Sequence, residues 1–97
     1  MSSFLLTLKA KNDLEEIHNF IAEDNPSAAL GFINVIQDKC QTIALSPEIG
    51  RVREELGLEI RSFPIKNYVI FYRIKNSTIQ IIRILHSARD IESIFNQ

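Results

Sequence analysis

A histidine, an arginine and an aspartate lie close together near the end of the chain, in the stretch RILHSARD. His86 ends an apolar run and is followed after three and four residues by Arg89 and Asp90. A histidine in this position is suited to general acid or base catalysis, because its unperturbed pKa lies near neutrality. The same residues suit a structural role, in which His86 caps a strand end and Asp90 pairs with an arginine. We favour the structural role, in which the three residues close a sheet and hold the tail in place.

Three further arginines interrupt stretches that otherwise have the composition of β-strands. Arg61 lies in LEIRSFPI, Arg73 in YVIFYRI and Arg83 in TIQIIRIL. A guanidinium group is costly to bury without a partner, so each must reach solvent or pair with a carboxylate.

Metal-free RNA cleavage is one reaction that such residues could support. It requires a proton acceptor, a proton donor and cations that stabilise the phosphorane charge. Tyr68, Tyr72, His86 and the arginines have the right chemistry, but their spacing does not require a site of this kind. We therefore assign no catalytic residue.

Nucleotide and metal sites find little support. The three glycines are scattered, and none precedes the Lys-Ser or Lys-Thr pair of a phosphate-binding loop. His18, Cys40 and His86 are far apart, without a His-x-x-x-His or Cys-x-x-Cys spacing, so we expect no metal and no other cofactor. Cys40 falls inside a helical apolar pattern and is expected to be a buried thiol.

The length and charge of the chain limit its number of domains and the partners that it can bind. A chain of 97 residues with 45% hydrophobic content forms one domain, residues 1–97, whose small core favours a permanent partner. The net charge of −1 is unfavourable for gripping a polyphosphate. Residues 1–50 carry three lysines against seven acidic residues, and residues 51–97 carry eight basic against five acidic residues. A basic second half suits an acidic partner or a phosphate, although such a split also arises by chance.

The start of the chain carries no targeting signal that we recognise. MSSFLLTL lacks a positively charged region and an apolar stretch of signal-peptide length, and nothing approaches the roughly 18 apolar residues of a membrane span. We expect a soluble, cytoplasmic protein.

The first half of the chain predicts a short strand followed by two helices. FLLTL, residues 4–8, is the candidate strand. Apolar residues then recur at steps of three and four, first at Ala10, Leu14, Ile17 and Ile21 and then at Ala29, Ile33, Ile36, Cys40 and Ile43. Pro26 separates the two helices, and SPEIG at 46–50 ends the second. The pattern indicates a helical hairpin with an apolar side to cover.

The second half predicts the sheet that covers it. Residues 58–65, 68–74 and 78–85 are rich in β-branched and aromatic residues and are separated by turn-length segments. With residues 4–8 they make an α+β fold of order β-α-α-β-β-β. We predict a mainly antiparallel four-stranded sheet with the hairpin on one face, and a short helical turn within 87–95.

Four stretches of the sequence, in this order along nearly the whole chain, resemble the ParE branch of the RelE/ParE superfamily of bacterial type II toxins. They are DLEEIHNFIAEDNPSAALGFINVI, LSPEIGRVREEL, IRSFPIKNYVIFYRI and IIRILHSARD. The most specific pieces are SPEIGRVREEL, YVIFYRI and ILHSARD. The resemblance implies the same fold, and a toxin neutralised by a cognate ParD-like antitoxin in a hetero-oligomer. For the ParE branch it also implies poisoning of DNA gyrase.

The RelE branch of the superfamily implies a different activity, cleavage of mRNA in the ribosomal A site by basic residues and a C-terminal tyrosine or histidine. Arg61 stands where that branch tends to have an arginine. The chain departs from the branch because its last residues, IESIFNQ, contain no tyrosine, and because its helices and loop lack dense lysines. These departures favour gyrase. A homologue that binds an antitoxin without being toxic is the remaining alternative.

A toxin of the ParE branch would need a binding surface and no catalytic group. We expect this surface on the sheet and C-terminal segment, and its candidate residues are Arg61, Arg73, Arg83, His86, Arg89 and Asp90. Nucleic acid would be reached only through the antitoxin or gyrase. The antitoxin segment would fold on binding, as an amphipathic helix with an added strand.

Overall fold

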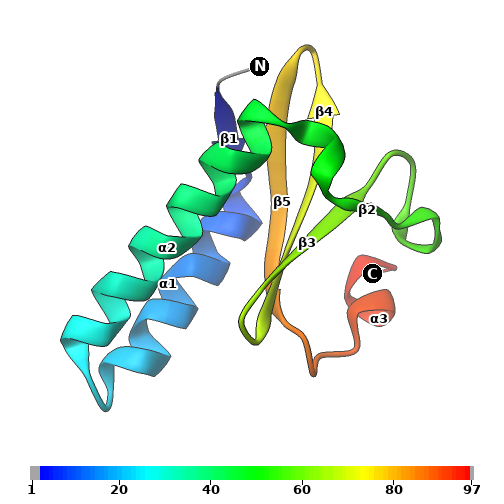
Figure 1. Cartoon of the computed structure of the whole chain (residues 1–97). Helices are drawn as coiled ribbons and strands as arrows, with labels where there is room; N and C mark the ends of the chain where they lie inside the picture. The colour runs from blue at the N-terminus through cyan, green and yellow to red at the C-terminus, as the bar shows by residue number, and fades with distance from the viewer. Residues whose placement is uncertain (1–2, 97) are drawn as a thin grey trace.

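The computed structural model describes residues 3–96 and is built on a five-stranded sheet with the strand order β1-β5-β4-β3-β2 (Figure 1). The strands are β1 (Phe4–Leu6), β2 (Arg51–Val52), β3 (Arg61–Ile65), β4 (Tyr68–Lys75) and β5 (Thr78–His86). β1 runs parallel to β5, and the other neighbours are antiparallel. The predicted α+β class and element order are confirmed. The prediction of four strands was wrong by one, because it missed the two-residue β2.

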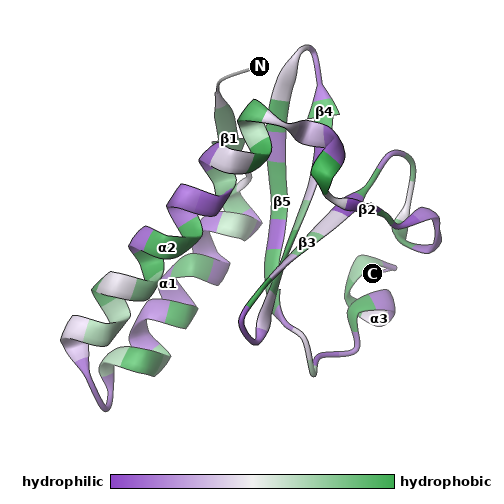
Figure 2. Cartoon of the chain, viewed as in Figure 1, coloured by the Kyte–Doolittle hydropathy of each residue, from purple (hydrophilic) through white to green (hydrophobic). Residues whose placement is uncertain are grey.

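Two long helices follow β1, as predicted. α1 (Leu8–Ala22) begins after Thr7, whose hydroxyl accepts a hydrogen bond from the Ala10 N–H, and α2 (Pro26–Leu45) begins after Asn25, whose side chain accepts from the Ala28 N–H. Such side chains satisfy amide groups that the first helical turn leaves without partners. Both helices are banded green and purple in Figure 2, as amphipathic helices should be.

The connection between α2 and β3 is more structured than the sequence indicated. It contains two short 3-10 helices, η1 (Pro47–Ile49) and η2 (Glu54–Leu56), with β2 between them. β3 begins at Arg61 instead of the predicted residue 58. Gly57 and Glu59 have φ values of +143° and +60°, outside the range of a regular strand, so the chain bends at residue 57 and turns at residues 58–59.

The sheet has two faces with different covers. On the face that we call the covered face, α1 and α2 pack against the core side chains Ile70, Tyr72, Ile79, Ile81 and Ile84. On the opposite, open face, a smaller cluster of Leu56, Ile60, Phe71 and Leu85 lies under the short helix α3 (Ile91–Phe95). Cys40 is buried in the covered-face core, as expected, and burial raises the pKa of its thiol to about 12.

Within the described part of the chain, no helix combines the length and apolar character needed to cross a membrane.

Candidate functional site

The predicted site residues come from β5, its neighbours β3 and β4, and the segment that follows β5. The centre of this region is a β-bulge. Phe71 of β4 lies opposite Arg83 of β5, whereas the next residue, Tyr72, lies opposite Ile81, so that Ile82 is an extra residue in β5. A bulge re-aims the side chains that follow it. Here it leaves Arg83 on the open face, opposite Phe71, with Ile84 in the covered-face core.

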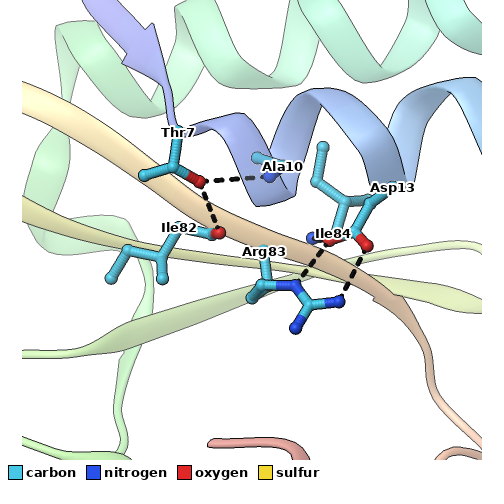
Figure 3. Close-up of polar contacts among 6 residues, drawn as sticks. All are labelled: Thr7, Ala10, Asp13, Ile82, Arg83 and Ile84. Carbon is cyan, nitrogen blue, oxygen red and sulfur yellow. Dashed lines mark hydrogen bonds and ion pairs between the residues drawn. The ribbon is translucent and has the colours of Figure 1, made fainter.

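Arg83 is held by a carboxylate that the sequence analysis did not identify. Its Nε and Nη2 atoms donate to Asp13 Oδ2 and Oδ1 at 2.8 and 2.9 Å, and the Ile84 N–H also donates to Asp13 Oδ2 (Figure 3). Asp13 belongs to α1 and is only 7% exposed. Its hydrogen bond raises the pKa of the Arg83 guanidinium. One carboxylate therefore pairs with the arginine and also takes the place of a neighbouring strand for a backbone N–H.

Thr7 likewise takes the place of a neighbouring strand, here for a carbonyl group of β5 that precedes Arg83. β1 pairs with β5 only as far as Ile81, and the Thr7 hydroxyl donates to the Ile82 carbonyl at 2.8 Å (Figure 3). The start of α1 thus completes the hydrogen bonding of β5 where β1 ends.

Arg73 lies on the open face beside Arg83. It is two residues from Phe71 along β4, and its Nε donates to Gln80 Oε1 on β5 at 3.0 Å. Residues two apart in a strand share a face, so Phe71, Arg73 and Arg83 belong to one surface.

Two further arginines complete this surface, and the sequence analysis missed both. Arg51 lies opposite Ser62, which in turn lies opposite Phe71. Arg53 donates to Glu55 at 2.7 Å and to Ser62, and its guanidinium lies 5.8 Å from the centre of the Phe71 ring. The alternating sequence RVR could have revealed them, because residues 51 and 53 of a strand would lie on the same face. We call Arg51, Arg53, Arg73 and Arg83 the open-face arginines.

Arg61 lies on the other side of the sheet. It is opposite Tyr72 of the covered face, and its Nη1 donates to the carbonyl oxygens of Gly50 at 2.8 Å and Glu48 at 3.2 Å. The Tyr72 hydroxyl donates to Pro47 and accepts from the Gly50 N–H, and burial raises its pKa. Gly50 has no room for a side chain, because a Cβ would overlap the Tyr72 hydroxyl. Arg61 and Tyr72 together hold the connection that leads into β2.

His86 and Asp90 are occupied by the turn after β5. His86 Nδ1 accepts from the Ala88 N–H, and its ring contacts the ring of Tyr68 edge to face at 5.1 Å. Asp90 caps α3 by accepting from the N–H and hydroxyl of Ser93. Asp90 thus bonds to Ser93 and not to an arginine.

His86 also lines two adjoining clefts of about 300 and 350 Å³ between the hairpin and the sheet end. Phe20 and Tyr68 line both clefts, Arg89 lines the first and Lys66 the second. Of the predicted residues, the structure therefore unites Arg73 and Arg83 on the open face and His86 and Arg89 at a cleft. Arg61 lies apart from both groups.

No group of His, Cys, Asp or Glu side chains among residues 3–96 is arranged to hold a metal ion. The site instead offers fixed cations and apolar surface.

Comparison with known proteins identifies relatives over nearly the whole chain. The sequence profile described as ParE toxin of type II toxin-antitoxin system, parDE, matches residues 4–91. Toxin RelE3 of Caulobacter vibrioides is 31% identical over 88 residues, covering 90% of this chain and 96% of the relative. Toxin ParE3 of the same organism is 27% identical over 86 residues, covering 88% and 86%.

A solved structure has a similar fold. It is described as the chromosomal ParDE TA system from P. aeruginosa, and it superposes with a TM-score of 0.75 at 25% identity, covering 89% of this chain and 96% of the other.

Proposed function

Because the chain belongs to the ParE toxin family of type II toxin-antitoxin systems, we propose that it stops growth by binding DNA gyrase and that a ParD-like antitoxin neutralises it. In the cytoplasm, the antitoxin would hold the toxin in an inactive hetero-oligomer. The toxin would act once it is released. The family match over residues 4–91 and the likeness to a ParDE structure support the antitoxin partner.

One observation carries the choice of a binding mechanism over a bond-breaking one. Three of the side chains that RNA cleavage could employ have structural tasks. Arg83 is paired with Asp13, Tyr72 holds Pro47 and Gly50, and the His86 Nδ1 atom accepts from the backbone. A protein can poison an enzyme by binding one of its conformations more tightly than the others, since this alone shifts the population toward that conformation.

We place the gyrase-binding surface on the open-face arginines. Arg51 and Arg73 project from neighbouring parts of this face, and the Arg53 guanidinium lies over the buried Phe71 ring, so several arginines gather on one surface. Arginine is among the side-chain types that contribute most to protein interfaces. Arg61, His86, Arg89 and Asp90 would serve the antitoxin or hold the elements around this surface in place.

The test is a supercoiling assay with purified gyrase and increasing amounts of the toxin. We expect inhibition and trapped cleaved DNA, reversed by the cognate antitoxin. Full supercoiling activity at excess toxin would exclude gyrase as the target.

A second candidate function is ribosome-dependent mRNA cleavage of the RelE type. It is favoured by the 31% identity to Toxin RelE3 and by the concentration of arginines on one sheet face, which could approach RNA phosphates. Primer extension on mRNA in programmed ribosomes would show A-site cuts if this function holds. If neither assay responds and induction leaves growth unchanged, the chain is a non-toxic antitoxin-binding homologue.

A further inference from the structure

The larger of the two clefts beside His86, with a volume of about 350 Å³, lies where the tip of the helical hairpin meets the turn between β3 and β4. Phe20 and Phe32 line it from α1 and α2, and Lys66, Tyr68 and His86 line it from the side of the sheet. Small-molecule sites in proteins usually have volumes of about 300–1,000 Å³. The cleft therefore has room for one ring system with a short substituent, and not for a long ligand.

Aromatic side chains form the apolar walls of this cleft. The ring centres of Phe32 and Tyr68 lie 5.6 Å apart, and the Tyr68 ring meets the His86 ring edge to face at 5.1 Å. Phe20 lines the same cleft and is 69% exposed, so most of its side chain has no protein cover. Aromatic rings pack favourably against one another in tilted and edge-to-face arrangements. These walls are therefore suited to a further aromatic ring, supplied by a ligand.

The charge at the cleft is positive. Lys66 and His86 are its basic residues, and no aspartate or glutamate of the described chain lines it. The Lys66 Nζ atom lies 5.6 Å from the centre of the Phe32 ring, and no carboxylate within residues 3–96 forms an ion pair with it. The smaller, adjoining cleft is mixed in charge, because two acidic residues line it together with Arg89. An anionic group should therefore lie in the larger cleft, near Lys66.

Two neutral hydrogen-bond donors belong to side chains of the same cleft. His86 Nδ1 accepts from the Ala88 N–H at 3.0 Å, so the proton of the neutral ring is on Nε2. Among the residues that the structure describes, none accepts a hydrogen bond from His86 Nε2 or from the Tyr68 hydroxyl. One ammonium group and two neutral donors match a carboxylate, which carries a single negative charge and accepts several hydrogen bonds. A phosphate group carries more negative charge and would need more cations than the cleft provides.

We propose that this cleft binds a small aromatic carboxylate, a free molecule with one planar ring system. The ring packs against Phe20, Phe32 and Tyr68. The carboxylate pairs with the Lys66 ammonium group and accepts a hydrogen bond from His86 Nε2. The site lies on the hairpin side of the sheet, away from the open-face arginines, so it is independent of the target of the toxin.

The test compares indole-3-acetate with its neutral amide, indole-3-acetamide, on the intact, isotope-labelled protein. The two probes share a ring system and differ in the charge of the substituent. We expect NMR shifts at Lys66, Tyr68 and His86 with indole-3-acetate and a Kd of about 1 mM or tighter. The amide should bind at least about fivefold more weakly, because it lacks the charge that pairs with Lys66. Absence of shifts at these residues, or equal binding of the two probes, would overturn the proposal.

A pair of lysine variants tests the position of the carboxylate. Lys66→Gln should weaken indole-3-acetate about fivefold and leave the Kd of the amide unchanged, because only the carboxylate pairs with the ammonium group. The matched control is Lys39→Gln. Lys39 Nζ also lies near an aromatic ring, 6.0 Å from the centre of Phe63, but Lys39 does not line the cleft. This variant should bind both probes normally, and an equal loss in the two lysine variants would overturn the assigned position.

A third variant tests the position of the ring. Phe20→Ser removes an aromatic wall at an exposed position, so the protein should fold as before. Indole-3-acetate should bind about threefold more weakly, because one ring contact is lost. Unchanged binding to a folded Phe20→Ser protein would contradict the proposed placement of the ring.

Discussion

The two faces of one sheet differ in what covers them and in what they expose. The covered face is buried under two helices of 15 and 20 residues, and its core side chains Ile70, Ile79 and Ile81 are fully buried. The open face is closed at one end by η2 and the five-residue α3, and it displays the open-face arginines beside that cover. Most of the buried apolar side chains, and so most of the hydrophobic stabilisation, belong to the first face. The second face is therefore freer to carry side chains chosen for binding.

Asp13 is the residue that joins the two faces. It belongs to a helix of the covered face, yet its carboxylate holds Arg83 of the open face and the Ile84 N–H. Breaking this link should therefore lower the free energy of unfolding more than a substitution confined to either face.

Asp13→Ala should give the largest loss of stability. The substitution leaves a partly buried guanidinium and a buried N–H without their partner, and we expect a loss of about 3–5 kcal/mol in the free energy of unfolding. Urea denaturation followed by circular dichroism measures it. The matched control is Asp38→Ala, at an exposed aspartate of α2, which should change stability by less than about 0.5 kcal/mol. A similar result for both variants would show that the link between the faces contributes little.

A pair of isoleucine truncations compares the faces directly. Ile81→Ala in the covered-face core should cost about 2–5 kcal/mol, because Ile81 is fully buried among helix side chains and the cavity cannot collapse. Ile94→Ala in α3 should cost about 1 kcal/mol, since Ile94 belongs to a short helix and is only partly buried against the open-face cluster. Thermal and urea unfolding give both values. An equal or larger loss for Ile94→Ala would mean that the open face is a second core.

The covered face should also set the response to alkaline pH. Burial raises the pKa of Cys40 to about 12 from its ordinary value of 9.0, so the folded protein keeps the thiol protonated where the unfolded chain ionises. The contribution of Cys40 to the free energy of unfolding is then constant below pH 9. It falls between pH 9 and 12, by up to about 1.4 kcal/mol for each pH unit. The raised pKa of Tyr72 acts in the same direction. The free energy of unfolding, obtained from denaturation curves across this pH range, should fall less steeply with pH in Cys40→Ala than in the unsubstituted protein. Identical slopes in the two proteins would contradict this account.

The fold was largely predictable because its elements depend on local periodicity. The apolar stripes of α1 and α2 and the dense β-branched runs of β4 and β5 each identify an element without reference to any other part of the chain. β2 escaped prediction because two residues carry no periodicity. It forms only where the connection after α2, held by Tyr72 and Arg61, meets β3.

The site was less predictable, because its geometry depends on pairings between distant residues. The bulge at Ile82 decides the side on which Arg83 lies, and the partner of Arg83 is 70 residues away on α1. Strand register likewise separates Arg61 from Arg73, although both appear in the sequence as an arginine within an apolar strand. Residue types therefore identified the cations, and only the register showed which of them share a surface.

Arg73→Ala should have the smallest effect on stability while still weakening toxicity. Arg73 is on the open face and bonds to Gln80 near solvent, so its loss should change the free energy of unfolding by less than about 0.5 kcal/mol. If the open face binds the target, the concentration needed to inhibit supercoiling should rise about tenfold, because an interfacial arginine is lost. Lys9→Ala, at an exposed residue of α1, removes the same charge elsewhere and should leave inhibition unchanged. Full potency of Arg73→Ala would show that the target contacts a surface other than the open face, and equal loss in both variants would show that net charge, and not position, governs binding.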